Sequence, residues 1–117
     1  MDYKFIKTEY IESVSGGDSG IILELVNLFG EQMAEISLEM RTLLERKDYI
    51  ALGALAHKAK SSVAIMGMND LADMLKTFEL QAKDNLGTDK FEIFISRFEH
   101  ETRGAEEELE NYVKNLK

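Results

Sequence analysis

The sequence predicts an all-α fold: an antiparallel, up-down-up-down four-helix bundle with a short N-terminal helix. Three observations predict it. Apolar residues recur at spacings of three and four along four long segments, no useful length of chain alternates as a half-buried strand does, and proline is absent. Helices joined by connections of about two to five residues become antiparallel neighbours. At 117 residues we expect one domain, residues 1–117, with a single hydrophobic core.

Glycine and short polar residues bound the first two helices. Thr8 is the expected cap of a short helix that runs through Val14 and ends at residues 15–17, Ser-Gly-Gly. Asp18 or Ser19 then caps a long helix that reaches about residue 45, a length of roughly 40 Å. The apolar stripe of this long helix comprises Ile22, Leu25, Phe29, Met33, Ile36, Met40 and Leu43.

The third helix follows a turn at residues 46–48 and carries both the next stripe and the residues of chemical interest. Asp48 is its expected cap and Gly67 its left-handed stop. The core stripe comprises Leu52, Leu55, Ala59, Ser62 or Val63, and Met66.

The last two helices show the same periodicity. Asn69 is the expected cap of the fourth helix, which ends near residues 85–87, and the fifth opens at Thr88 or Asp89, where Glu92 resembles the second half of a capping box. The two stripes comprise Leu71, Met74, Leu75, Phe78 and Ala82, then Phe91, Phe94, Ile95, Phe98, Ala105, Leu109, Tyr112 and Leu116.

Composition excludes several classes of function. The chain has no cysteine, which rules out disulfides, thiolate metal sites and cysteine nucleophiles. A net charge of −8 disfavours binding to nucleic acid. No apolar run approaches the roughly 18 residues of a membrane span, and no signal peptide is evident, so we expect a cytoplasmic protein that does not bind membranes. The start of the chain at Met1, close to the first helix, fits a free-standing protein.

His57 is the candidate for chemistry because of its angular position on the third helix. At about 100° per residue, the core residues Leu55, Ala59 and Met66 lie about 160° to 200° away from it. The imidazole is therefore expected to point outward, with a ring nitrogen available for nucleophilic attack. The second histidine, His100, is expected to be a solvated surface residue. No metal site is expected, since the two histidines lack the spacing of metal-binding motifs.

The outer face around His57 carries mostly small residues. Gly53, Ala54, Lys60, Ser61 and Ala64 lie within about 60° of it, where longer charged side chains are usual. Such a patch would let a partner protein approach closely, although small residues can also cluster in a helix by accident. Lys60, three residues after His57, would attract a phosphoryl group on the ring, although its spacing equally fits an ordinary solvated lysine.

Ile50 and Met68, near the two ends of the same face, would add apolar contact with a docking partner.

The stretch 52–67, with AHKAKSS at 56–62, resembles the signature of histidine-containing phosphotransfer (HPt) domains. That signature is a histidine, a lysine three residues later, two small residues and a terminal glycine. Residues 10–18, 29–32 and 75–79 resemble further parts of the family pattern, and together the resemblance covers about residues 8–84. Many members have glycine where this chain has Ser61, a residue small enough that we expect activity to survive.

The resemblance implies a phosphoryl carrier in a two-component phosphorelay, not an enzyme in its own right. His57 would be the phospho-acceptor, Lys60 its electrostatic partner beside Ser61, and Glu79 a ring-orienting acceptor, although a plain surface carboxylate is an equal interpretation of Glu79. The expected partners are receiver domains of response regulators and a sensor histidine kinase of the simple or hybrid type. A receiver would bring Mg²⁺, and the chain itself would bind no cofactor and remain monomeric.

Two other interpretations stay open. The first is an HPt-like adaptor that binds a partner without being phosphorylated, although an adaptor needs neither His57 nor Lys60. The second is a histidine-based hydrolase, for which the sequence offers no Ser-His-Asp arrangement, phosphate-binding glycine loop or metal cluster.

Overall fold

The computed structural model of the protein describes residues 3–116, which fold into five α-helices and one 3₁₀ turn and contain no strand. The helices are α1 (Thr8–Ser15), α2 (Ser19–Arg46), α3 (Tyr49–Ile65), α4 (Asn69–Lys83) and α5 (Phe91–Lys114), and the 3₁₀ turn is η1 (Thr88–Lys90). The all-α class and the short N-terminal helix are therefore as predicted.

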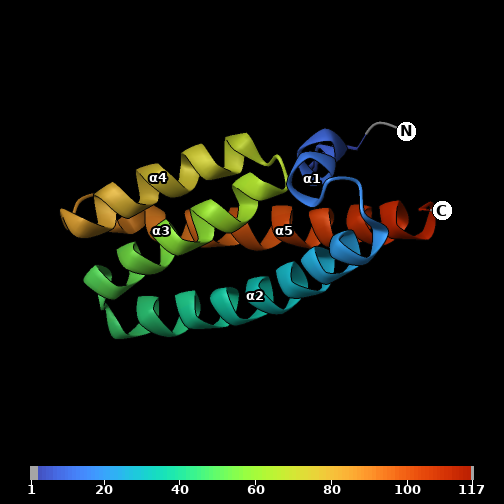
Figure 1. The fold of residues 1–117 in the computed structure, drawn as a ribbon. Coiled ribbons are helices and arrows are strands. Elements are labelled where there is room, and N and C mark those ends of the chain that lie inside the picture. The colour runs from blue at the N-terminus through green and yellow to red at the C-terminus, as the bar shows by residue number, and fades with distance from the viewer. Residues whose placement is uncertain (1–2, 117) are drawn as a thin grey trace.

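The four long helices pack in pairs into an elongated body of 47 × 20 × 20 Å. Helix α2 packs on α3 and α5, and α4 packs on the same two helices. Figure 1 shows the α2–α3 and α4–α5 connections at one end of the body, with α1, the α3–α4 connection and both chain ends toward the other.

The predicted apolar stripes form one continuous core. Fully buried side chains come from every helix, with Phe78, Phe91 and Phe98 among the largest. Helix α5 also buries Thr102, whose hydroxyl donates to the carbonyl of Phe98. Three residues of the predicted stripes, Leu25, Phe94 and Leu116, are only partly buried against the core. The burial of this apolar surface is the main term that stabilises the fold.

Two of the expected helix caps are confirmed. The carboxylate of Asp18 accepts from the amide of Ile21 at 3.1 Å, and that of Asp48 accepts from the amide of Ala51 at 3.2 Å. Gly67 has a φ of +79°, so it is the left-handed stop that the sequence predicts after α3.

Three other expected caps were wrong, although each helix begins within three residues of the expected position. Thr8 is the first residue of α1, which follows Lys7 without a side-chain cap. Asn69 does not cap α4, because its amide donates to the Tyr10 hydroxyl at 3.1 Å. The expected capping box at Asp89 is absent, because residues 88–90 form η1 and the carboxylate of Glu92 pairs with an arginine of another helix.

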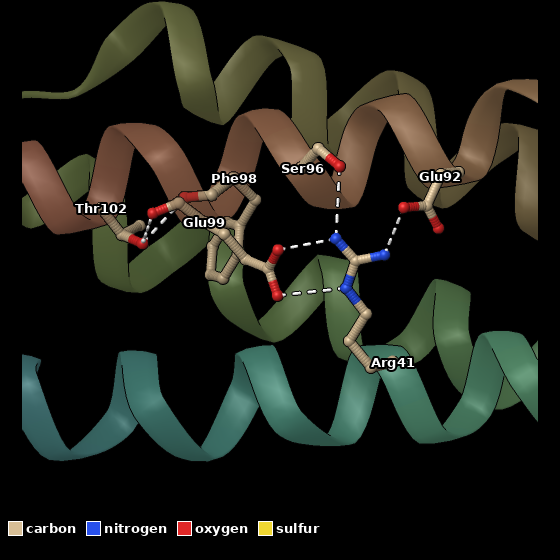
Figure 2. Close-up of polar contacts among 6 residues, drawn as sticks. All are labelled: Arg41, Glu92, Ser96, Phe98, Glu99 and Thr102. Atoms are coloured by element: carbon tan, nitrogen blue, oxygen red, sulfur yellow. Dashed lines mark hydrogen bonds and ion pairs between the residues drawn. The ribbon is translucent and has the colours of Figure 1, made fainter.

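That arginine, Arg41, ties α2 to α5. Its guanidinium binds both carboxylate oxygens of Glu99, at 3.2 and 2.7 Å, and reaches Glu92 at 2.6 Å and the Ser96 hydroxyl at 3.2 Å (Figure 2). The hydrogen bonds that Arg41 donates to the Glu99 and Glu92 carboxylates raise the pKa of Arg41 above its ordinary value. This cluster braces α2 against α5.

The N-terminal segment is held by hydrogen bonds to α5 and to the end of α3. The carboxylate of Glu108 accepts from the amides of Lys4, Phe5 and Ile6 at 2.7 to 3.0 Å. The amide of Lys7 donates to the carbonyl of Met66 at 3.0 Å. These bonds fix the approach to α1 at the far end of the molecule.

Candidate functional site

His57 lies in the middle of α3 with its side chain 62% exposed. Its helix neighbours Ala56 and Ala59 are fully buried, so the ring stands on the outer side of the helix while the flanking positions hold α3 to the core. The expectation of an outward imidazole is confirmed.

Glu79 of α4 faces this ring. Its carboxylate oxygens lie 3.0 and 3.1 Å from Nδ1 of His57, and the residue is only 6% exposed, so it is not the plain surface carboxylate that the sequence left open. An ionised carboxylate only accepts hydrogen bonds, so Nδ1 must carry the proton. In the neutral ring, the lone pair is then on Nε2, which is the nitrogen that the hydrogen bond leaves free.

Two lysines share the Glu79 carboxylate with the ring. Nζ of Lys83 donates to Oε2 at 2.8 Å, whereas Nζ of Lys60 lies 3.7 Å from Oε1. The hydrogen bond from Lys83, followed by that from His57, lowers the pKa of Glu79 to about 2, although burial acts in the opposite direction. Glu79 is therefore ionised throughout the physiological pH range. Its carboxylate carries no proton and acts only as an acceptor for the proton on Nδ1 of His57.

Gly53 explains how α4 comes close enough to reach the ring. A Cβ at this position would lie 3.2 Å from the carbonyl oxygen of Glu79, 3.3 Å from Cβ of Ala82 and 3.4 Å from Cγ of Lys83. Gly53 lies one helical turn before His57. The missing side chain thus admits the turn of α4 that carries Glu79.

The structure corrects two of the residues expected on the docking face. Gly53 is buried under α4, so it serves contact between two helices of this chain instead of contact with a partner. Met68 is 4% exposed, because the chain leaves the helical path at Gly67 and turns Met68 into the core. Both errors have the same cause: the prediction used angular positions around α3 alone and took no account of where α4 packs or where α3 ends.

The other expected residues are accessible. Ile50 is exposed, as are Ala54 and Ser61, and Ala64 is half-buried. The side chain of Lys60 is 28% exposed, and its Nζ lies 3.7 Å from Oε1 of Glu79.

A groove between α2 and α3 was not predicted from the sequence. Ser61 lines it together with exposed Leu28 of α2 and Ile65 of α3, and Gln32 accepts a hydrogen bond from Ser62 across it at 3.2 Å. The available signal was the apolar character of Leu28 and Ile65 at positions outside the core stripes. These residues extend the accessible face from His57 towards α2.

His100 is exposed, as expected, and its ring meets that of Phe5 edge-on with centroids 6.3 Å apart. Among residues 3–116 no group of three or more His, Cys, Asp or Glu side chains is arranged to hold a metal ion. No helix in this described part is both long and apolar enough to cross a bilayer.

The family model of the Hpt domain matches residues 24–117, which is most of the chain and includes the whole of α3, α4 and α5. The chain therefore belongs to the Hpt domain family, whose members are phosphocarrier modules that interact with receiver domains and histidine kinases in two-component phosphorelays. The match begins within α2, so residues 10–18, which resemble the family lead-in, lie outside it. Comparisons with curated proteins and with solved structures found no match.

Proposed function

We propose that the chain is a phosphoryl carrier in which Nε2 of His57 accepts a phosphoryl group from the phosphoaspartate of a receiver domain and returns it to another. The observation that carries the proposal is the hydrogen bond between Nδ1 of His57 and the buried carboxylate of Glu79. It leaves a free lone pair on Nε2 of an exposed imidazole, in a chain of the Hpt family.

The transfer is an in-line displacement at phosphorus. The Nε2 lone pair forms the new N–P bond as the P–O bond to the receiver aspartate breaks, and the departing carboxylate keeps the electron pair. The ring, still protonated at Nδ1, gains positive charge, which the anionic Glu79 stabilises. The ammonium of Lys60 lies beside the ring and offers charge to the equatorial phosphoryl oxygens.

The proposed docking surface for the receiver consists of Ile50, Ala54, Ser61 and Ala64 on α3 with the groove formed by Leu28 and Ile65. Its support is accessibility: these side chains are exposed or half-buried, and the groove adjoins the ring through Ser61. The small residues near His57 leave space for a partner aspartate. The receiver would supply Mg²⁺, which neutralises the charge of the transferring phosphoryl group.

We also infer that residues 1–117 are one domain and that the long helices form an antiparallel up-down-up-down bundle. Their pairwise packing and the short connections between them support this arrangement. A cytoplasmic location and a monomeric state remain predictions from the sequence and the family likeness.

The test is incubation of the chain with a phosphorylated receiver domain and Mg²⁺. Wild type and His57→Gln are compared, with His100→Gln as the control for loss of an exposed histidine outside the site. We expect an acid-labile, base-stable phosphate on wild type and on the control, and none on His57→Gln. Equal labelling of His57→Gln refutes the site, and a chain that binds the receiver but never takes label is an adaptor instead.

A further inference from the structure

We propose that Lys83 is a positioning residue: it is the hydrogen-bonded counter-ion of the Glu79 carboxylate, and it thereby keeps Lys60 from closing onto that carboxylate and leaves the Lys60 ammonium available to the phosphoryl group. The inference rests on the proposed function and extends it to a residue outside the family signature found in the sequence. It follows from the way in which His57, Lys60 and Lys83 contact the two oxygens of the buried Glu79 carboxylate.

The three side chains contact the Glu79 carboxylate at different distances. Lys83 makes a direct 2.8 Å hydrogen bond to Oε2 of Glu79, while Lys60 stays 3.7 Å from Oε1, beyond hydrogen-bonding distance. His57 contacts both oxygens through Nδ1. Within residues 3–116, these three side chains are the ion-pair and hydrogen-bond partners of the Glu79 carboxylate.

The position of Lys83 on α4 places its ammonium beside Glu79. It lies four residues after Glu79, so the two side chains are neighbours on the surface of α4. Its stem passes over Gly53, with Cγ only 3.4 Å from the place of the absent Cβ. The side chain is 51% exposed, so its ammonium is hydrated on one side while it donates to Glu79 on the other.

Removal of Lys83 changes where Lys60 goes. A buried carboxylate that loses its hydrogen-bonded cation draws the nearest remaining one, and Lys60 needs to move by less than about 1 Å to turn its 3.7 Å ion pair with Oε1 into a direct hydrogen bond. Lys60 is then held by Glu79 and contributes less to the transferring phosphoryl group. The role of Lys83 in transfer is thus exerted through Lys60 and Glu79, without contact with the phosphoryl group.

The first test measures phosphoryl transfer from a phosphorylated receiver for Lys83→Met, Lys83→Arg and Lys114→Met. Lys114 is the matched control because it is an exposed lysine in the last turn of α5, as Lys83 is in the last turn of α4. We expect Lys83→Met to lower the transfer rate constant about two- to fivefold at unchanged receiver affinity, the range for a partly exposed pair. Lys83→Arg should restore most of the rate, and the control should match wild type.

The second test combines Lys83→Met with Lys60→Met. If Lys83 acts through Lys60, its removal from the Lys60→Met background should change the rate by less than about 1.5-fold, because the effects of coupled residues are not additive. A full two- to fivefold loss in that background overturns the proposal. So does equality of Lys83→Met and Lys114→Met in the first test.

A third measurement needs no phosphoryl donor and therefore separates failure of this inference from failure of the proposed function. Nitrogen-detected NMR of the unphosphorylated protein follows the Lys60 ammonium and the Nδ1 proton of His57. In Lys83→Met we expect the Lys60 ammonium resonance to shift and its exchange with water to slow, with no such change in Lys114→Met. An unaltered Lys60 signal overturns the role of Lys83, whatever the labelling experiment gives.

Discussion

Replacement of Gly53 by alanine tests the packing that brings Glu79 to His57. The added Cβ would lie 3.2 Å from the Glu79 carbonyl oxygen and 3.3 Å from Cβ of Ala82. One is a backbone atom and the other is the Cβ atom of an alanine, so neither can move unless α4 itself moves. The variant therefore separates α3 from α4 by a few tenths of an ångström at the turn that carries the carboxylate.

Two opposing effects set the magnitude. Alanine is favoured over glycine in a helix interior by about 1 kcal/mol. Overpacking of a close helix contact costs about 1–3 kcal/mol. We expect Gly53→Ala to lower the free energy of unfolding by about 1 kcal/mol, which is a fall in Tm of roughly 4 °C for a domain of this size.

Gly30 supplies the control, since it is a helix-interior glycine with space around it. A Cβ there would meet only Oε1 of Glu106, at 3.9 Å. We expect Gly30→Ala to raise the free energy of unfolding by up to about 1 kcal/mol, so the two variants should differ by about 2 kcal/mol. Urea and thermal unfolding followed by circular dichroism measure both. Equal stabilisation of the two variants refutes the account of Gly53 as the close contact.

Three further predictions concern Glu79 and Arg41. Glu79→Gln keeps an acceptor for the Nδ1 proton but loses the charge, so phosphoryl transfer should slow less in it than in Glu79→Leu, where we expect a loss of about tenfold or more in a rate assay. Because the pKa of Glu79 is lowered from 4.5 to about 2, its stabilising contribution is complete above pH 4.5 and is lost as the pH falls toward 2. Urea titrations should therefore show wild type losing its advantage over Glu79→Gln across that window, and a difference constant to pH 2 contradicts the assignment. Arg41→Met should lower the free energy of unfolding by about 1 kcal/mol while the phosphoryl transfer rate is unchanged, and a slowed transfer would contradict its purely bracing role.

The sequence predicted those parts of the fold that depend on local chemistry. Helical periodicity gives the core stripes, and the carboxylates of Asp18 and Asp48 cap their helices because each can reach an amide three residues onward. The same rule fails for Asn69, whose side-chain amide instead meets Tyr10, a residue far away in the chain. A local signal does not show which distant partner competes for a side chain.

In the candidate site, too, the features that depend on one helix were predicted and those that depend on packing between helices were not. The outward position of His57 follows from the angles of one helix, and it is confirmed. The burial of Gly53 and the proposed role of Lys83 depend on where α4 lies. The angular positions of residues on α3 do not predict where α4 packs. The proximity of Glu79 to the ring was expected only from the family likeness, and its burial was not expected at all.

The most direct test of the central claim is the position of the phosphoryl group on the imidazole. Glu79 occupies the Nδ1 side of the His57 ring, so phosphorylation should occur on Nε2. Phosphorus and nitrogen NMR of the chain, phosphorylated by a receiver domain, distinguishes the two nitrogens through their couplings to phosphorus. A single phosphoryl group on Nε2 of His57 agrees with the account, and one on Nδ1 or on another side chain contradicts it.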